Sequence, residues 1–266
     1  MSDYGGSYSG FRLEQDGPVL TCLFNRPEVL NAYNPDIYAE ISRLCKAVGP
    51  DKNIRVVIVT GEGSAFCVGG NVKKFVSGET DTPGLVRENF LTHSEVNGFL
   101  DLPQPTIAMI NGDAIGGGFA FALQCDILVA STKARIGFAY SRIGLSPSTP
   151  LLALTPLMAS LNLVKEYVFS GELIPSDEAL RIGLVNHVYP HEELDKRTRE
   201  LAGRIASASP VSTRFAKLIL NKEIRRRNIE LDTAAEALLA LSSEMDDHAE
   251  GKQAFVEHRK PRFTGS

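Results

Sequence analysis

The sequence predicts an α/β fold followed by a helical C-terminal region, and three observations lead to this prediction. Short β-branched, apolar runs at 54–60 and 106–110 each end in a glycine-rich turn, as strands often do. Segments with strand and helix character alternate up to Pro150, which is typical of a largely parallel sheet with helical connections. After Pro150 almost every segment has helical spacing.

The N-terminal half begins with an expected hairpin, whose two strands flank the turn at Asp16 and Gly17. A helix follows, for which Asn34 is the expected cap and Pro35 the first helical residue. The remaining elements are expected in chain order as strand 54–60, helix 84–100, strand 106–110, helix 116–124 and strand 126–130. This alternation favours parallel pairing of the strands.

The C-terminal half is expected to consist of helices with one short strand at 185–189. The predicted helices are 150–170, 176–182, 191–207, 210–223 and 229–247. Pro210 stands at a favourable helix start, and Ser176 begins another helix with acidic residues behind it. We therefore expect an α/β core over 1–200 and a helical region over 201–266.

Composition restricts the class of protein. The chain has 266 residues, 43% of them apolar and 23% charged, as in globular proteins that bury a sizeable core. A formal net charge of -4 does not favour nucleic acid as a partner. No apolar run approaches membrane-spanning length, and no signal peptide is expected. Four cysteines without a CxxC pair indicate reduced thiols, no metal and a cytoplasmic location.

Two glycine-rich turns, at 66–71 and 111–118, carry the most information about function. Glycine lets a backbone approach a ligand closely, and the first N–H groups of a helix have no partner inside it. Two such turns that face each other are able to hold one carbonyl oxygen as it becomes an oxyanion. No GK[ST] follows the turns and GGG is not GxGxxG, which argues against nucleotide phosphate as the ligand.

Several segments in order along the chain resemble the enoyl-CoA hydratase/isomerase (crotonase) superfamily. They are NRPEVLNA at 25–32, FCVGGN at 66–71, NGDAIGGG at 111–118, CDI at 125–127 and the segment from Gly171 to Asn186 that contains GLVN. The resemblance implies a spiral of ββα units, followed by a helical region used for oligomerisation or as a lid. It also implies an acyl-CoA thioester substrate, no separate cofactor, and a homotrimer or a hexamer built as a dimer of trimers.

By resemblance, the backbone N–H groups of Gly70 and Gly117 form the oxyanion hole. Hydratases of the family also carry two glutamates that activate water, but the matching positions here hold Ala120 and Tyr140. A third position, an aspartate in some relatives, holds Ser148. Alanine transfers no proton, and tyrosine has an unperturbed pKa of about 10, so it is a poor base at neutral pH.

Three groups are candidates to replace the missing carboxylates. Asp113 stands in the second glycine turn, although a plain turn carboxylate is the more favoured interpretation. His93 precedes strand 106–110, where a dehalogenase branch of the family has a catalytic histidine; an ordinary surface histidine is favoured. Tyr140 with Ser141 and Ser148 forms either a polar wall that orients substrate or water, or simple aromatic packing against the acyl tunnel. Ala120 is expected in the same substrate pocket as Tyr140 and Ser148.

The resemblance also implies which residues bind the CoA part of the substrate. They are Arg26, Val29, Leu30, Val68, Asn71, Val72, Phe255 and His258. Arg26 suits a phosphate, but it serves equally well to stabilise its own loop. Residues 74–92 are expected to wall the acyl pocket.

The reaction stays open among hydration, double-bond isomerisation, C–C cleavage and thioester hydrolysis. A non-catalytic acyl-CoA-binding homologue is the alternative from another class, because loss of both glutamates would leave such a site behind. Nucleotide binding is the third hypothesis and the least favoured.

Overall fold

The computed structural model describes residues 4, 6–33, 36–72 and 98–266. Its larger sheet has six strands in the order β1-β2-β3-β5-β7-β10. Their bounds are β1 Phe11–Asp16, β2 Val19–Phe24, β3 Val56–Gly61, β5 Thr106–Ile110, β7 Ile127–Ser131 and β10 His187–Tyr189. The hairpin pair β1 and β2 is antiparallel, and every later pair is parallel. All residues of β3 and β5 are buried, as expected for strands covered on both faces.

A second sheet has four short strands in the order β4-β6-β8-β9. Their bounds are β4 Ala65–Cys67, β6 Asp113–Ile115, β8 Arg135–Gly137 and β9 Ile174–Pro175. The chain passes from β3 to β4, from β5 to β6 and from β7 to β8, so each turn of the spiral adds one strand to each sheet. This arrangement carries the end of β4 beside the end of β6, where the two glycine-rich turns begin.

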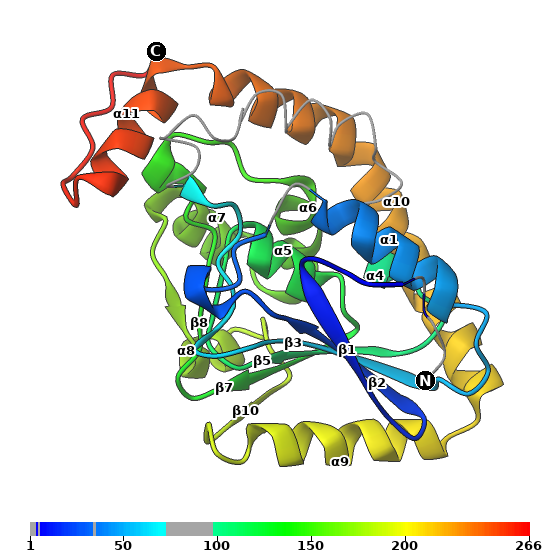
Figure 1. Cartoon of the computed structure of the whole chain (residues 1–266). Helices are drawn as coiled ribbons and strands as arrows, with labels where there is room; N and C mark the ends of the chain where they lie inside the picture. The colour runs from blue at the N-terminus through cyan, green and yellow to red at the C-terminus, as the bar shows by residue number, and fades with distance from the viewer. Residues whose placement is uncertain (1–3, 5, 34–35, 73–97) are drawn as a thin grey trace.

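Helices surround the two sheets (Figure 1). In chain order they are the 3-10 helix η1 Pro27–Val29, α1 Ile37–Val48, α4 Gly98–Asp101, α5 Gly117–Leu123, the 3-10 helix η3 Tyr140–Ile143, α6 Thr149–Met158, α7 Leu161–Ser170, α8 Ser176–Arg181, α9 Leu194–Ser207, α10 Pro210–Ser243 and α11 Asp246–Val256. α9 covers one face of the large sheet and packs on β2, β3, β5 and β7. α9 crosses the expected domain boundary between residues 200 and 201. Its apolar residues on both sides of that boundary pack into the same core cluster.

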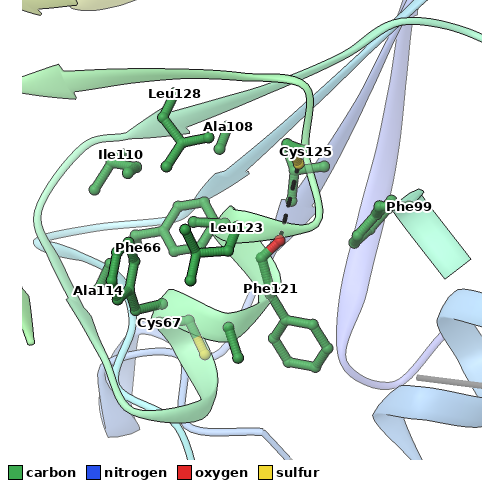
Figure 2. Packing of buried hydrophobic residues seen from close by; sticks show 14 of the residues in the cluster. Phe66, Cys67, Phe99, Ala108, Ile110, Ala114, Phe121, Leu123, Cys125 and Leu128 are labelled. Atoms are coloured by element: carbon green, nitrogen blue, oxygen red, sulfur yellow. Dashed lines mark hydrogen bonds between the residues drawn. The ribbon is translucent and has the colours of Figure 1, made fainter. Parts of the chain in front are cut away.

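The short helix α5 lies at the centre of the main core. Figure 2 shows side chains of β4, β5 and β7 gathered around it, among them Phe66, Ile110 and Leu128. Every residue of α5 is buried, and the Cys125 thiol contacts the Phe121 carbonyl at its end, at 3.9 Å. The N-terminus of α5 is therefore held in a fixed place by dense packing.

Two predicted helix boundaries are wrong. The expected helices 210–223 and 229–247 form one helix, α10, that ends at Ser243. Nothing between them breaks a helix, and Arg226 pairs with Glu223 and Glu230 one turn away on either side. The expected helix 150–170 is instead two helices, because Ala159 adopts an extended conformation between α6 and α7.

Other boundaries agree more closely with the sequence. β5 has the predicted bounds, while β3, β7, α5, α8, α9 and β10 differ from them by a few residues. Asn34, Pro35 and most of the expected helix 84–100 lie outside the described residues. Among the described residues, no helix combines the length and apolar character needed to cross a lipid bilayer.

Candidate active site

The two glycine-rich turns meet backbone to backbone. Gly69 has a φ of +80°, and a Cβ placed on it would lie 3.0 Å from the Gly117 nitrogen and 3.0 Å from the Ile115 oxygen. A Cβ on Gly118 would lie 1.8 Å from the Cys67 oxygen. Side chains at these positions would force the turns apart, so glycine is required for the approach.

The backbone N–H groups of Gly70 and Gly117 are both available to a ligand. Within the described part of the chain, neither N–H donates to another protein atom. The contact of Gly69 with Gly117 limits the separation of the two nitrogens to about 7 Å by standard backbone dimensions. Two backbone nitrogens that donate to the same oxygen lie at most about 6 Å apart. The limit of about 7 Å on the separation of the Gly70 and Gly117 nitrogens is therefore compatible with one shared acceptor.

The orientation of each turn is fixed by its neighbours. The Tyr33 N–H donates to the Gly69 oxygen at 3.0 Å. Since C=O and N–H of a trans peptide point in opposite directions, the Gly70 N–H points away from the Tyr33 backbone. The Gly116 N–H donates to the Gly137 oxygen at 2.8 Å, which ties the start of α5 to β8. The orientations of both N–H groups are therefore fixed in the absence of a ligand.

Tyrosine side chains surround the N-terminus of α5. A Cβ on Gly117 would lie 2.6 Å from the Tyr33 ring, and one on Gly116 would lie 3.6 Å from the Tyr140 ring. The Tyr33 and Tyr38 rings pack against each other, with their centroids 5.6 Å apart. Burial raises the pKa of Tyr33 to about 12 and raises the pKa of Tyr38 and Tyr140 as well. All three hydroxyls are therefore neutral at physiological pH.

Ala120 and Tyr140 are the two residues that the resemblance matches to the family's glutamates, and this match stays a prediction. Ala120 is buried on α5, and the Tyr140 hydroxyl lies 3.2 Å from the Ser148 hydroxyl. Tyr140 belongs to η3, and Ser148 immediately precedes α6. These contacts bring Tyr140 and Ser148 together in one polar group beside the glycine turns.

One carboxylate that no sequence motif indicates lies close to this group. Glu236 on α10 is only 9% exposed, and its Oε1 accepts a hydrogen bond from the Thr149 hydroxyl at 3.3 Å. Its negative charge is also among the causes of the raised pKa values of Tyr33, Tyr38 and Tyr140, after burial. No sequence pattern marks this contact, because Glu236 stands in an ordinary polar and apolar helical pattern 87 residues from Thr149.

The other two candidate acid or base residues have different surroundings. Asp113 on β6 receives two hydrogen bonds from Arg135 on β8, at 2.9 and 2.6 Å. This pairing favours the interpretation of Asp113 as a carboxylate that links neighbouring strands. His93 lies outside the described residues, as does the expected pocket wall at 74–92.

The expected CoA-binding residues fall into two groups. Near η1, the Val68 N–H donates to the Leu30 oxygen at 3.3 Å, and Leu30 is 46% exposed. The Arg26 guanidinium donates to the Ala32 oxygen at 2.9 Å, which favours its role in stabilising the loop. Val29 belongs to η1, and Asn71 and Val72 follow Val68 closely in the sequence. Each of these three residues is partly exposed.

Phe255 and His258 belong to the C-terminal end of the chain. Phe255 is 51% exposed on α11, and His258 follows that helix with a φ of +55°. α11 packs on η3, which carries Tyr140. Contact of these two residues with CoA stays a prediction.

The spiral of two sheets and the glycine turns that meet at the N-terminus of α5 are features of a class of α/β enzymes. Residues 14–266 match the protein family described as Enoyl-CoA hydratase/isomerase, and the chain belongs to that family. This match confirms the family resemblance indicated by the glycine turns and the other sequence motifs.

Known relatives match over almost the whole chain. The protein is 32% identical over 259 residues to the short-chain-enoyl-CoA hydratase of Clostridium acetobutylicum, covering 93% of this chain and 95% of that one. It is 30% identical over 263 residues to the crotonyl-CoA hydratase of Syntrophomonas wolfei, covering 97% and 98%. The crystal structure of an enoyl-CoA hydratase from Mycobacterium avium subsp. paratuberculosis matches with a TM-score of 0.84 at 26% identity, covering 97% of this chain and 100% of that one. The protein thus has the crotonase fold, with two mixed sheets and a long helical C-terminal region.

Proposed function

We propose that the protein processes acyl-CoA thioesters by stabilising a thioester enolate between the N–H groups of Gly70 and Gly117. The observation that carries this proposal is the close contact of Gly69 with the Gly117 nitrogen, beside two N–H groups with no partner in the described residues. One donor of this kind contributes about 3 kcal/mol to transition-state stabilisation. The coenzyme A is part of the substrate, so no separate cofactor is needed.

Hydration of a 2-enoyl-CoA is the first reaction that we propose. The names of the relatives from Clostridium acetobutylicum and Syntrophomonas wolfei support it. Water would add its oxygen to the β carbon and lose a proton to a base, while the electron pair of the double bond moves toward the thioester. The resulting enolate then takes a proton at the α carbon.

Double-bond isomerisation is the second candidate. It is favoured by the replacement of both usual glutamates by Ala120 and Tyr140, because an isomerase needs no group to position water. One base can remove a proton from the α carbon of a 3-enoyl-CoA and return it to the γ carbon. Hydrolysis, C–C cleavage and non-catalytic binding remain the alternatives.

Turnover of two substrates tests the proposal. We expect the purified protein to hydrate crotonyl-CoA or to convert a 3-enoyl-CoA into its 2-enoyl isomer, each followed by the absorbance of the conjugated thioester. Calorimetric titration with butyryl-CoA measures binding separately. Binding without turnover of any thioester would support a non-catalytic homologue, and absence of binding would contradict the acyl-CoA assignment.

We also propose that residues 201–266 join copies of the chain into a homotrimer or a hexamer, and help to cover the site. Exposed apolar side chains on α10 support this role; they are Val211, Phe215, Leu218, Ile219, Leu220, Ile229, Leu231, Leu238 and Leu241. A cytoplasmic location is supported by four free cysteines, which suit a reducing compartment. Analytical ultracentrifugation measures the oligomeric state, and a monomer at micromolar concentration would contradict the proposed assembly.

A further inference from the structure

Glu236 is a buried carboxylate that the known pattern of the family does not account for in this chain. It lies in the C-terminal third of α10, is only 9% exposed, and faces α6. Carboxylates are rarely buried to this degree, because removing the charged group from water is costly. Its location beside a site that has lost its usual acid and base groups raises the question of its role.

Two hydrogen bonds fix the position of this part of α10. Thr149 at the start of α6 donates to Glu236 at 3.3 Å, and the Ser146 N–H donates to the Ser242 hydroxyl at 3.0 Å. Both contacts come from the segment that also carries Ser148. α10 therefore holds Glu236 against the loop that carries the polar partner of Tyr140.

A continuous set of contacts connects Glu236 with the proposed oxyanion hole. Glu236 bonds to Thr149, the neighbouring Ser148 bonds to Tyr140, and the Tyr140 ring lies against Gly116. On the other side, the Tyr33 ring lies against Gly117. These contacts link the Glu236 carboxylate, through Thr149 and Ser148, to the tyrosine ring that borders the N-terminus of α5.

We infer that Glu236 is the proton-transferring carboxylate of this site, and that it takes over from the positions held by Ala120 and Tyr140. The inference rests on the proposed function, because it needs a thioester carbonyl at Gly70 and Gly117. The Glu236 carboxylate accepts a proton from the α carbon of the acyl group. The C–H electron pair forms a C=C bond, and the carbonyl π pair moves to the oxygen held by the two N–H groups. Return of the proton to carbon reverses the step.

The surrounding hydroxyls suit this assignment. Tyr33, Tyr38 and Tyr140 are among the described titratable groups within electrostatic reach of Glu236, and burial raises the pKa of all three. They stay neutral and serve as hydrogen-bond donors, so they do not compete with the carboxylate as bases. The purely structural alternative is that Glu236 serves to join α10 to α6, with Thr149 among its partners.

Exchange of α protons for deuterium in butyryl-CoA separates these two roles, because it reports proton removal without hydration or isomerisation. Glu236→Gln keeps the size of the side chain and an oxygen that accepts from Thr149. We expect it to bind butyryl-CoA within about threefold of the wild type and to lose at least about 100-fold in exchange rate. Added formate is expected to restore part of the exchange in Glu236→Ala, which a structural role would not allow.

Glu230→Gln is the matched control, since Glu230 lies on the same helix, is 55% exposed and pairs with Arg226. It is expected to exchange at the wild-type rate. Thr149→Val tests the structural contact alone and should lower the melting temperature more than Glu236→Gln does. Exchange by Glu236→Gln within about tenfold of the wild type would overturn the role of Glu236 and leave the proposed function intact. Failure of the wild type to bind or exchange butyryl-CoA would overturn both.

Discussion

The Lys217 ammonium lies 2.7 Å from the Asp126 carboxylate, in an ion pair that anchors α10 to the end of the large sheet. The Lys217 side chain is 5% exposed and also donates to the carbonyl oxygens of Phe99 and Gln104. Asp126 accepts from the Thr106 N–H and hydroxyl at 2.7 and 2.9 Å. The pair therefore joins α10, β5 and the start of β7.

Loss of either partner should destabilise the protein, but not equally. Asp126→Asn leaves a buried ammonium without a carboxylate, and we expect a loss of about 3 kcal/mol in the free energy of unfolding. Lys217→Met leaves Asp126 with its Thr106 donors and 21% exposure, so the expected loss is about 1 kcal/mol. Urea denaturation measures both. Equal losses, or a larger loss for Lys217→Met, would contradict this account of the pair.

Alanine substitutions in the second glycine turn should have different consequences at neighbouring positions. At Gly118 the new Cβ meets the Cys67 backbone oxygen at 1.8 Å, so Gly118→Ala is expected to prevent correct folding. At Gly117 it meets the Tyr33 ring at 2.6 Å, and a side chain is able to move. We expect Gly117→Ala to fold and to lose at least about tenfold in kcat through a displaced donor. Adding Tyr33→Ala should recover part of that loss, and no recovery would argue against a steric cause.

His248 should make the protein less stable in mild acid. Its Nδ1 bonds to the Ile143 oxygen at 2.7 Å, and burial lowers the pKa of its imidazole below the usual 6.5. The unfolded chain therefore binds the proton first as the pH falls. Stability contributed by the neutral imidazole is present above about pH 6.5 and is lost below it, by up to about 1.4 kcal/mol per pH unit.

A substitution of His248 tests the predicted loss of stability at low pH. His248→Asn keeps a donor for the Ile143 oxygen and removes the titration, so it should flatten the decrease in stability between about pH 6.5 and 5. His187→Gln serves as the control, because His187 is exposed on β10. Thermal unfolding across this pH range measures the effect, and an unchanged slope in His248→Asn would show that another group is responsible.

Tyr140 should act as a hydrogen-bond donor and not as a base. Burial raises the pKa of its hydroxyl, and the hydroxyl interacts with Ser148 at 3.2 Å. We expect Tyr140→Phe to lower kcat by no more than about tenfold, as for loss of one neutral hydrogen bond. Steady-state kinetics measure kcat of Tyr140→Phe and of the companion variant Ser148→Ala. A loss of hundredfold or more would instead assign proton transfer to Tyr140.

The sequence predicted those parts of the fold that have enough residues to show a pattern. β3 and β5 are six and five residues long with four apolar residues each, and α1 and α9 have clear helical faces. The four strands of the small sheet have two or three residues each, too few for any periodicity. They form because the chain returns beside its preceding turn, which is a property of the tertiary structure.

The same distinction applies to the site. The glycine turns were evident because close backbone contacts need glycine at defined positions. The roles of Tyr33 and Glu236 were not evident from the sequence. Tyr33 lies beside Gly117, and Glu236 lies beside Thr149, only because segments far apart in sequence come into contact. Residues of ordinary type acquire their environment only from the fold, and pattern analysis of one sequence does not detect them.

A structure of the protein with butyryl-CoA bound tests the central claim most directly. The distances to measure run from the thioester oxygen to the backbone nitrogens of Gly70 and Gly117. The account predicts that both are hydrogen-bond distances of about 2.7–3.2 Å. A thioester oxygen bound elsewhere, or held by only one of these nitrogens, would contradict it.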